Sequence, residues 1–267
     1  MRNRKLLLIK LILVIMSISL VIAGCNTNGK VTEKKVEKSK AGSETTPRVE
    51  ESKVKGETTP KVGDKSERRE MDNNIPDSLD DIKDDAEDIV EDTTKEDWTE
   101  INEKLSSIER NWSLYETMAK EKKVSKGELD KFIDDLNNLK KEVKDKKTYE
   151  TKLAANRLAI TSTDFMKLYE RKFLVDIEKI ELYGKQILFT AEHDDWEQSK
   201  VELKSAMKIW NEAQMEADKI DPNITKRVSD IMTNISDAID AKDNKKIKET
   251  YEVLDDELDK LEDRFRI

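Results

Sequence analysis

Apolar side chains recur at three- and four-residue steps along most of the chain after residue 76. The clearest series has seven members: Trp98, Ile101, Leu105, Ile108, Trp112, Tyr115 and Ala119. Steps of this size place apolar side chains in one stripe along an α-helix, as in a helical bundle or coiled coil. No segment alternates apolar and polar residues as a half-buried strand does. The pattern therefore predicts an all-α fold.

Eight helices are predicted in this region. Their expected ranges are 78–91, 95–121, 126–144, 147–170, 174–192, 195–220, 223–241 and 245–266. Ser125 and Glu128 have the spacing of a capping box, in which each side chain binds a backbone amide of the other residue. Asp221 precedes a proline suited to the first helical position. Thr94 is a further N-cap candidate, so capping residues precede three of the predicted helices.

The helical region contains two similar halves. Its tryptophans form two pairs with the same internal spacing of 14 positions, and the pairs are offset by 98: Trp98 with Trp112, and Trp196 with Trp210. The third helices match with an offset of 99, and the fourth helices match again with 98. We therefore expect two copies of a four-helix unit, at residues 77–170 and 171–267.

The join between the two copies lacks a clear helix breaker from Thr148 to Glu192. The pattern therefore allows one shared helix of about 45 residues and about 67 Å, at 1.5 Å per residue. Units joined in this way would lie end to end. The expected fold is all-α, with two tandem duplicated four-helix units forming an elongated helical bundle behind a disordered tether.

Residues 25–76 differ in composition from the helical region. They are rich in Lys, Glu, Thr, Ser and Gly, contain almost no large apolar residue, and repeat a short motif as GSETTPRV and GETTPKV. Such a segment cannot bury enough apolar surface to offset the entropy lost on ordering. We expect a disordered tether that acts as a spacer, with contact between its basic residues and anionic lipid or wall polymer as the alternative.

The segment before Cys25 combines a basic start with a long apolar run. The chain opens with MRNRK and continues with LLLIKLILVIMSISLVIAG. The stretch between Lys10 and Cys25 is too short to cross about 30 Å of hydrocarbon as a helix. This arrangement at residues 1–24 is typical of a secretory signal peptide rather than of a membrane-spanning anchor.

The apolar run ends in Ile22-Ala23-Gly24-Cys25, which contains the one cysteine of the chain. This tetrad resembles the lipobox of bacterial lipoprotein precursors, and the resemblance covers residues 1–25. It implies cleavage before Cys25, diacylglycerol on the thiol, and often acylation of the new N-terminus. Two or three acyl chains give stable membrane anchoring. The resemblance therefore implies a location at the extracytoplasmic face of the cell membrane.

Composition argues against several activities. The net charge of −9 disfavours nucleic-acid binding, because phosphate binding needs a basic face. One cysteine cannot form an internal disulfide, and one histidine, His193, cannot form a zinc cluster. The acidic run between Asp80 and Asp92 lacks the glycine of a calcium loop and is expected to be a solvated face. We also find no phosphate loop or nucleophile elbow, so we expect neither catalysis nor a cofactor or metal.

Asn156 and Thr163 are the candidate site residues within the helical region. With the offset of 98 they match Leu254 and Leu261, which lie on the apolar stripe of the fourth helix of copy 2. Three interpretations are open. The helix is rotated so that both residues face solvent, both belong to a polar layer between helices, or both serve a binding site. A buried amide without partners costs about 1–3 kcal/mol, so the last two require partners.

The function expected from these patterns is a lipid-anchored extracytoplasmic helical interaction or scaffold module of the bacterial cell envelope, without catalysis. Its partners would be the membrane, through Cys25, and an envelope protein, but not nucleic acid. The alternative is a solute- or metal-binding lipoprotein with a polar site between helices. A deep pocket with convergent polar groups would favour a small ligand, whereas an exposed apolar groove would favour a partner helix or peptide.

Overall fold

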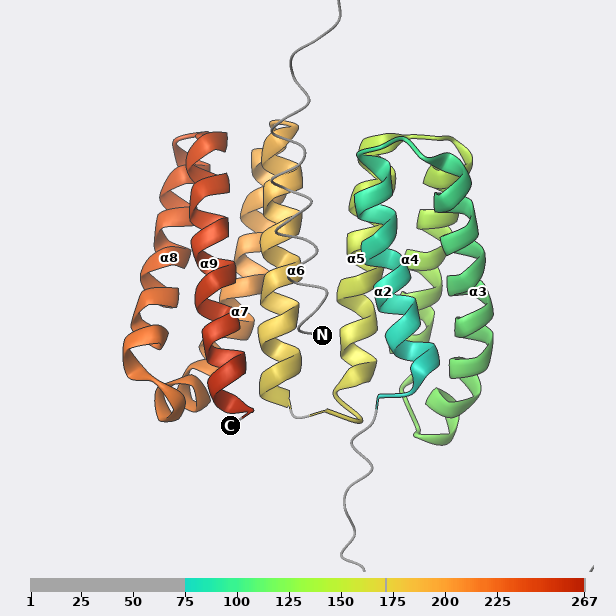
Figure 1. Ribbon diagram of the computed structural model, residues 1–267, viewed down its shortest axis with the longest axis horizontal. Coiled ribbons are helices and arrows are strands. Elements are labelled where there is room, and N and C mark those ends of the chain that lie inside the picture. The colour runs from blue at the N-terminus through green and yellow to red at the C-terminus, as the bar shows by residue number, and fades with distance from the viewer. Residues whose placement is uncertain (1–74, 171, 267) are drawn as a thin grey trace, which may run out of the picture. The chain divides into compact units, whose positions relative to one another are not determined.

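The computed structural model describes residues 75–170 and 172–266, and within these ranges the fold is all-α without strands (Figure 1). The helices are α2 (Asp77–Thr93), α3 (Trp98–Glu121), α4 (Lys126–Lys144), α5 (Thr148–Met166), α6 (Lys172–Glu192), α7 (Trp196–Ile220), α8 (Pro222–Asp240) and α9 (Asn244–Phe265). None of them is long and apolar enough to cross a membrane. The predicted fold class is confirmed. The predicted signal peptide, Cys25 and the tether up to residue 74 lie outside the described residues, whereas Ile75, at the end of the predicted tether, packs against the core of copy 1.

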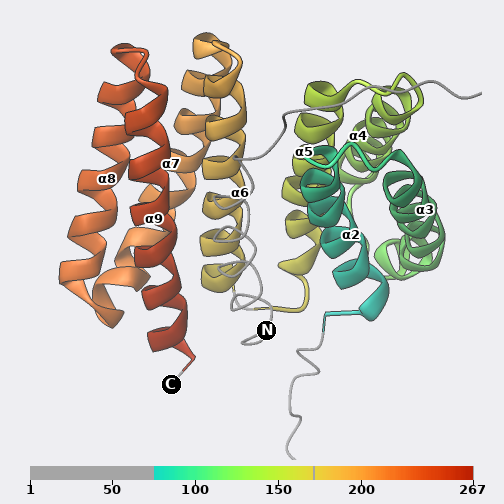
Figure 2. The ribbon, with the colours of Figure 1, turned by 45° about the horizontal axis from the view of Figure 1, so that its top comes forward.

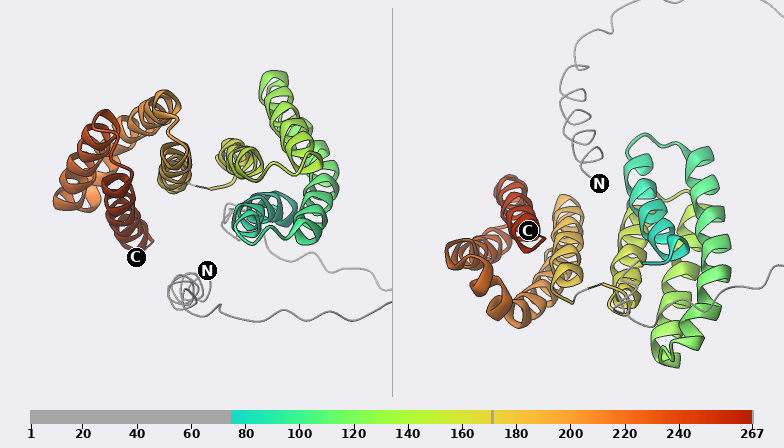
Figure 3. Two further views of the ribbon diagram at one scale, coloured as in Figure 1. Left: turned by 90° about the horizontal axis from the view of Figure 1, so that it is seen from above. Right: turned by 60° about the horizontal axis from the view of Figure 1, so that its bottom comes forward.

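The helices form two sets of four, seen from further directions in Figure 3. Helices α2–α5 make copy 1 and helices α6–α9 make copy 2, and each set has its own apolar core. The core of copy 1 is rich in aromatic rings, with Trp112 stacked on Phe132 at 4.0 Å between centroids. The core of copy 2 is mainly aliphatic around Trp210. The tryptophans on the apolar stripes therefore pack into cores, Trp98 only partly.

Local capping explains where several helices begin. The Ser125 hydroxyl accepts the amide of Glu128, whose carboxylate reaches back to the Ser125 amide, so the predicted capping box is present. Asp221 caps α8, with Pro222 at its first position. The cap expected at Thr94 is wrong, because α2 continues to Thr93 and Asp97 caps α3 instead.

The shared helix allowed by the sequence is also wrong. Helix α5 ends at Met166 and α6 begins at Lys172, and the two helices lie side by side (Figures 1 and 2). They run in opposite directions: Asp164 accepts a hydrogen bond from Lys179 at 2.5 Å, while Asn156 contacts Gln186. The two copies are therefore joined by a helical hairpin and not by one long helix.

The reason for this hairpin is the distribution of buried residues around both helices. Twelve of the 19 residues of α5 and 14 of the 21 residues of α6 are buried. A straight helix through both segments would present a second apolar face to water on each. Folding back buries these two faces against each other, which the hydrophobic effect favours.

The connections between helices define which residues are equivalent in the two copies. Glu96 and Asp194 have φ values of 54° and 58° and lie 98 positions apart, whereas Lys146 and Lys242 have 51° and 54° and lie 96 apart. The α3–α4 connection has four residues and the α7–α8 connection has one, while α7 is one residue longer than α3. The fourth helices therefore match with an offset of 96, not 98.

This offset corrects the match on which the candidate site was based. Leu254 and Leu261 are equivalent to Leu158 and Phe165, and all four are buried. The offset of 99 used for the third helices is wrong for the same reason. Offsets of 99 and 96 differ by three residues, close to one helical turn, so an apolar stripe satisfies both almost equally well.

Candidate functional site

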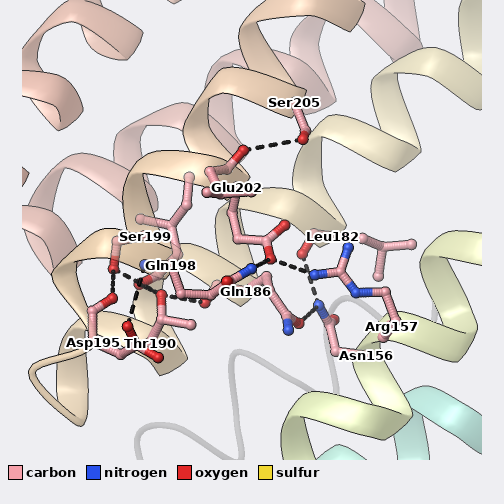
Figure 4. A network of polar contacts seen from close by, with 12 residues as sticks. Asn156, Arg157, Leu182, Gln186, Thr190, Asp195, Gln198, Ser199, Glu202 and Ser205 are labelled. Atoms are coloured by element: carbon pink, nitrogen blue, oxygen red, sulfur yellow. Dashed lines mark hydrogen bonds and ion pairs between the residues drawn. The ribbon is translucent and has the colours of Figure 1, made fainter. Parts of the chain in front are cut away.

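Asn156 is fully buried on α5 and faces α6 (Figure 4). Its Nδ2 donates to the backbone oxygen of Leu182 at 2.9 Å and to Oε1 of Gln186 at 2.6 Å. Its Oδ1 is buried without a hydrogen-bond partner. Because the carbonyl of Leu182 can only accept, Nδ2 must face it and a flipped amide would not supply the missing bond. Asn156 therefore holds α5 to α6 and keeps one unpaired acceptor.

Thr163 lies two turns further along α5 and is also fully buried. Its hydroxyl donates to the backbone oxygen of Ile160 at 2.7 Å, within its own helix. The interpretation in which Asn156 and Thr163 face solvent is wrong. The structure places both at buried positions of α5, but it does not join them by hydrogen bonds into one polar cluster.

A second group of polar contacts extends from α5 to α7 and was not expected from the sequence (Figure 4). The Arg157 guanidinium pairs with the carboxylate of Glu202, which is only 1% exposed and also accepts a hydrogen bond from Gln198. Nearby, the hydroxyls of Thr190 and Ser199 are 2.8 Å apart. The Arg157–Glu202 pair therefore links copy 1 to copy 2, whereas the Thr190–Ser199 contact joins α6 to α7 within copy 2.

Ion pairs also connect α2 to α6. Lys83 lies 2.7 Å from Glu178, and Lys185 lies 2.6 Å from Glu87. Burial disfavours the charged form of Glu87, but Lys185 and Lys83 outweigh it and lower the pKa of Glu87 to about 2. Burial raises the pKa of Glu178 despite the neighbouring Lys83. The charged groups of this face neutralise one another across the join between the copies.

The corrected equivalence explains why Asn156 and Thr163 are polar. Their counterparts in copy 2 are Glu252, which is exposed, and Asp259, which is half-buried. The same face of the fourth helix is thus polar in both copies. In copy 1 it is covered by α6, and in copy 2 no further helix follows among the described residues.

Two groups could suggest metal or acid–base chemistry. Carboxylate oxygens of Glu181, Asp259 and Glu262 lie within 4.8 Å of one another, and oxygen ligands suit calcium. All three are half-buried, and three neighbouring carboxylates on a helical surface do not by themselves make a metal centre. His193 is exposed and stacks on Tyr149 with 3.5 Å between ring centroids, so its ring serves packing at a helix end.

An open groove of about 700 Å³ lies between α7 and α8 in copy 2. Its lining includes the apolar side chains of Leu203, Met207 and Ile239. Lys200, Lys204 and Lys208 of α7 also line it, together with the carboxylates of Glu212 and Asp240, which pair with Lys172 and Lys200. Leu203 and Ile239 are buried, whereas Met207 and the lysines are exposed, unlike Asn156.

No protein-family model matches this chain. Comparisons with curated proteins and with solved structures likewise find no match. The buried contacts among α5, α6 and α7, and the open groove between α7 and α8, are therefore the features from which a function is inferred.

Proposed function

We propose that this chain is a non-catalytic helical interaction module of the bacterial cell envelope, held at the extracytoplasmic face of the membrane by a lipid on Cys25. The anchor follows from the resemblance of Ile22-Ala23-Gly24-Cys25 to a lipobox. The interaction role follows from the helical region, where an accessible surface and a closed interior can be distinguished.

The observation that carries the interaction role is that the buried polar groups between α5, α6 and α7 already bind one another. Asn156, Arg157 and Glu202 bind partners on neighbouring helices. These contacts stabilise the packing of the two copies and leave little binding capacity for a substrate. In contrast, α7 exposes Val201 and Met215, which are 54% and 74% exposed, on the helix that also lines the groove. Exposed apolar side chains near a groove are typical of surfaces that bind other proteins.

A solute- or metal-binding lipoprotein is the second candidate. The observation that favours it is Oδ1 of Asn156, a buried acceptor without a partner. An entering ligand with a donor group would satisfy this atom, since an unpaired buried acceptor costs about 1–3 kcal/mol. Isothermal titration with calcium or zinc, comparing the natural chain with Asn156→Leu, tests the metal form of this candidate. Heat that depends on Asn156 would favour it over the interaction module.

The anchor is tested by metabolic labelling of cells with radioactive palmitate. The natural chain should incorporate label and lose the segment that precedes Cys25. Cys25→Ala should incorporate none and accumulate as the longer precursor, because the thiol is the acyl acceptor. Ser19→Ala, in the same apolar run, is the matched control and should be processed normally. Labelling of Cys25→Ala would contradict the lipobox interpretation.

The interaction role is tested by crosslinking on intact cells followed by mass spectrometry. We expect crosslinks from lysines of the helical region to one or a few envelope proteins. Crosslinks confined to residues within the chain itself, in cells where the lipidated protein is abundant, would contradict the proposed module.

A further inference from the structure

The groove between α7 and α8 has a basic edge and an apolar floor. Lys200, Lys204 and Lys208 follow one another at four-residue steps, so they stand on one edge of α7. Leu203 and Ile239 are buried in the floor, and Met207 is 38% exposed at its surface. A chain lying in the groove could therefore bury apolar side chains against the floor while its charged groups meet the lysines.

Two of the three lysines have no acidic partner. Lys200 lies 3.0 Å from Asp240 across the groove. Within the part of the chain that the structure describes, neither Lys204 nor Lys208 forms an ion pair, although most lysines of α6, α8 and α9 do. In a protein with a net charge of −9, two adjacent unpaired lysines create a local site for a negatively charged group.

The matching surface of copy 1 differs in both charge and shape. Asn102, Ser106 and Arg110 occupy the positions of Lys200, Lys204 and Lys208, and they line a smaller hollow of about 440 Å³ that also contains Glu103. The basic row is thus a feature of copy 2 and not a consequence of the shared fold.

An ion pair bridges the corresponding two helices of copy 1. Lys140 on α4 pairs with Glu109 on α3. The equivalent residues in copy 2 are Ser236 and Met207, which cannot form an ion pair and which line the groove. In the α7–α8 groove a short hydroxyl and a flexible thioether thus take the place of this charged bridge. Methionine adapts its shape to different apolar partners.

We propose that the α7–α8 groove of copy 2 binds an acidic amphipathic segment of a partner protein. Aliphatic side chains of the segment pack on Met207, Leu203 and Ile239, and its carboxylates pair with Lys204 and Lys208. A concave groove with an apolar floor suits an inserted helix or peptide better than a flat bilayer surface. This assignment rests on the proposed interaction function and names the chemistry of the partner.

The proposal is tested with the full chain and a fluorescent synthetic peptide long enough for about five helical turns, in which leucines follow helical spacing and all other positions are glutamate or alanine. Binding is measured by fluorescence anisotropy. The double variant Lys204→Glu/Lys208→Glu should weaken binding by about tenfold or more, because two attractive contacts become repulsive. Both side chains are exposed, so folding should be unchanged by circular dichroism.

The matched control carries the same change in net charge on copy 1. Lys120→Glu/Lys126→Glu alters two exposed lysines of α3 and α4, far from the groove in the sequence and in the other copy. Its affinity for the peptide should stay within about twofold of the natural chain, since overall charge acts weakly at physiological salt. Equal losses in both double variants would overturn the proposal, as would a natural chain that does not bind the peptide.

Two further measurements distinguish a failure of the groove assignment from a failure of the proposed interaction module. Vesicles containing phosphatidylglycerol replace the peptide in a co-sedimentation assay. Binding of the vesicles that depends on Lys204 and Lys208, without peptide binding, would assign the groove to a lipid surface and overturn the proposal. Crosslinks in cells that persist in Lys204→Glu/Lys208→Glu would also overturn it while leaving the interaction module intact, whereas the absence of all partner crosslinks in the natural chain contradicts the module itself.

Discussion

Helix α5 of copy 1 and helix α9 of copy 2 are equivalent elements in different surroundings. Both have a buried stripe toward their own core, with Leu158 and Phe165 in α5 matching Leu254 and Leu261 in α9. Their opposite faces differ because α6 covers that of α5. The same polar face is therefore buried at Asn156 and exposed at Glu252. Burial of this face is set by the neighbouring helix rather than by the sequence of the helix itself.

The first helices of the two copies show the same principle. Glu87 of α2 and Lys185 of α6 are equivalent residues, 98 positions apart, and they form an ion pair with each other. An identical charged residue at this position in both copies would bring like charges together. Divergence to opposite charges converts a repulsive contact into an attractive one and helps hold the copies together.

The largest effect is expected at the central tryptophan of copy 2. Trp210 is 2% exposed, and its Nε1 donates to Ser229 Oγ at 2.9 Å. Trp210→Ala should lower the free energy of unfolding by about 3–5 kcal/mol, because it leaves a cavity and removes the hydrogen bond to Ser229. Trp98→Ala should cost less, since Trp98 is only partly buried.

Urea denaturation followed by circular dichroism measures both tryptophan variants. A change within about 0.5 kcal/mol for Trp210→Ala, the range expected for a surface substitution, would show that this core is not closed.

A smaller effect is expected where copy 2 has a glycine packed on a tyrosine and copy 1 has two alanines. Ala86 and Ala155 of copy 1 correspond to Gly184 and Tyr251. A Cβ atom at Gly184 would lie 2.8 Å from the Tyr251 ring, so Gly184→Ala should cost about 1–3 kcal/mol.

The matched test is the same substitution in a Tyr251→Ala background. There the clash is absent, and Gly184→Ala should be neutral or stabilise the helix by up to about 1 kcal/mol, because alanine favours helix over glycine. A change of sign between the two backgrounds, measured by denaturation, would sharpen the comparison. Equal effects in both backgrounds would show that Tyr251 does not pack on Gly184.

Substitutions of Asn156 on α5 and Gln186 on α6 should have non-additive effects on stability, because the two side chains contact each other. Asn156→Leu removes the donor for Gln186 Oε1 and leaves that oxygen buried, so we expect a loss of about 1–2 kcal/mol. Asn156→Leu/Gln186→Leu removes both partners and should recover most of the loss. Glu252→Leu, at the exposed equivalent position, should change stability by less than about 0.5 kcal/mol. A double variant no better than the single one would contradict the paired contact.

An effect of similar size concerns pH. Glu87 has a pKa of about 2 in the folded chain, below its ordinary value of 4.5. Its ionised form therefore stabilises the folded state above pH 4.5, and this stabilisation is lost as pH falls toward 2. Because the side chain is 30% exposed, solvent screening reduces the contribution to about 1–2 kcal/mol. Glu87→Gln should show this deficit at pH 7 and lose it near pH 2, and a deficit independent of pH would contradict the assignment.

The sequence predicted the helices well because its signals are local. Apolar stripes indicated all eight, although they left α5 and α6 open to one shared helix, and Ser125 and Asp221 marked two starts that the structure confirms. The break between α5 and α6 has no proline or glycine. Its signal was instead the spread of small residues around α5, including Ala154, Ala155 and Ala159, which allows close packing on more than one side.

The match between the α4–α5 hairpin of copy 1 and the α8–α9 hairpin of copy 2 could not be read from the sequence for a different reason. Its turn uses Lys146 and Lys242 with positive φ, where glycine is the usual marker. Without that marker, the third helices, α4 and α8, can be matched with a shift of three residues that leaves the apolar stripe almost unchanged. The partners of Asn156 lie on α6, 26 and 30 residues away, so they could be identified only once the hairpin was known.

The arrangement of α5 and α6 is tested most directly by a distance between their outer ends. Spin labels at Glu150→Cys and Asp194→Cys, in a Cys25→Ser background, occupy exposed positions next to Tyr149 and His193, whose rings stack at 3.5 Å. Double electron–electron resonance should give a single short distance, with the labels separated mainly by their own linkers. A distance of about 66 Å, which about 44 residues of continuous helix would span, would contradict the hairpin and the account of the two copies built on it.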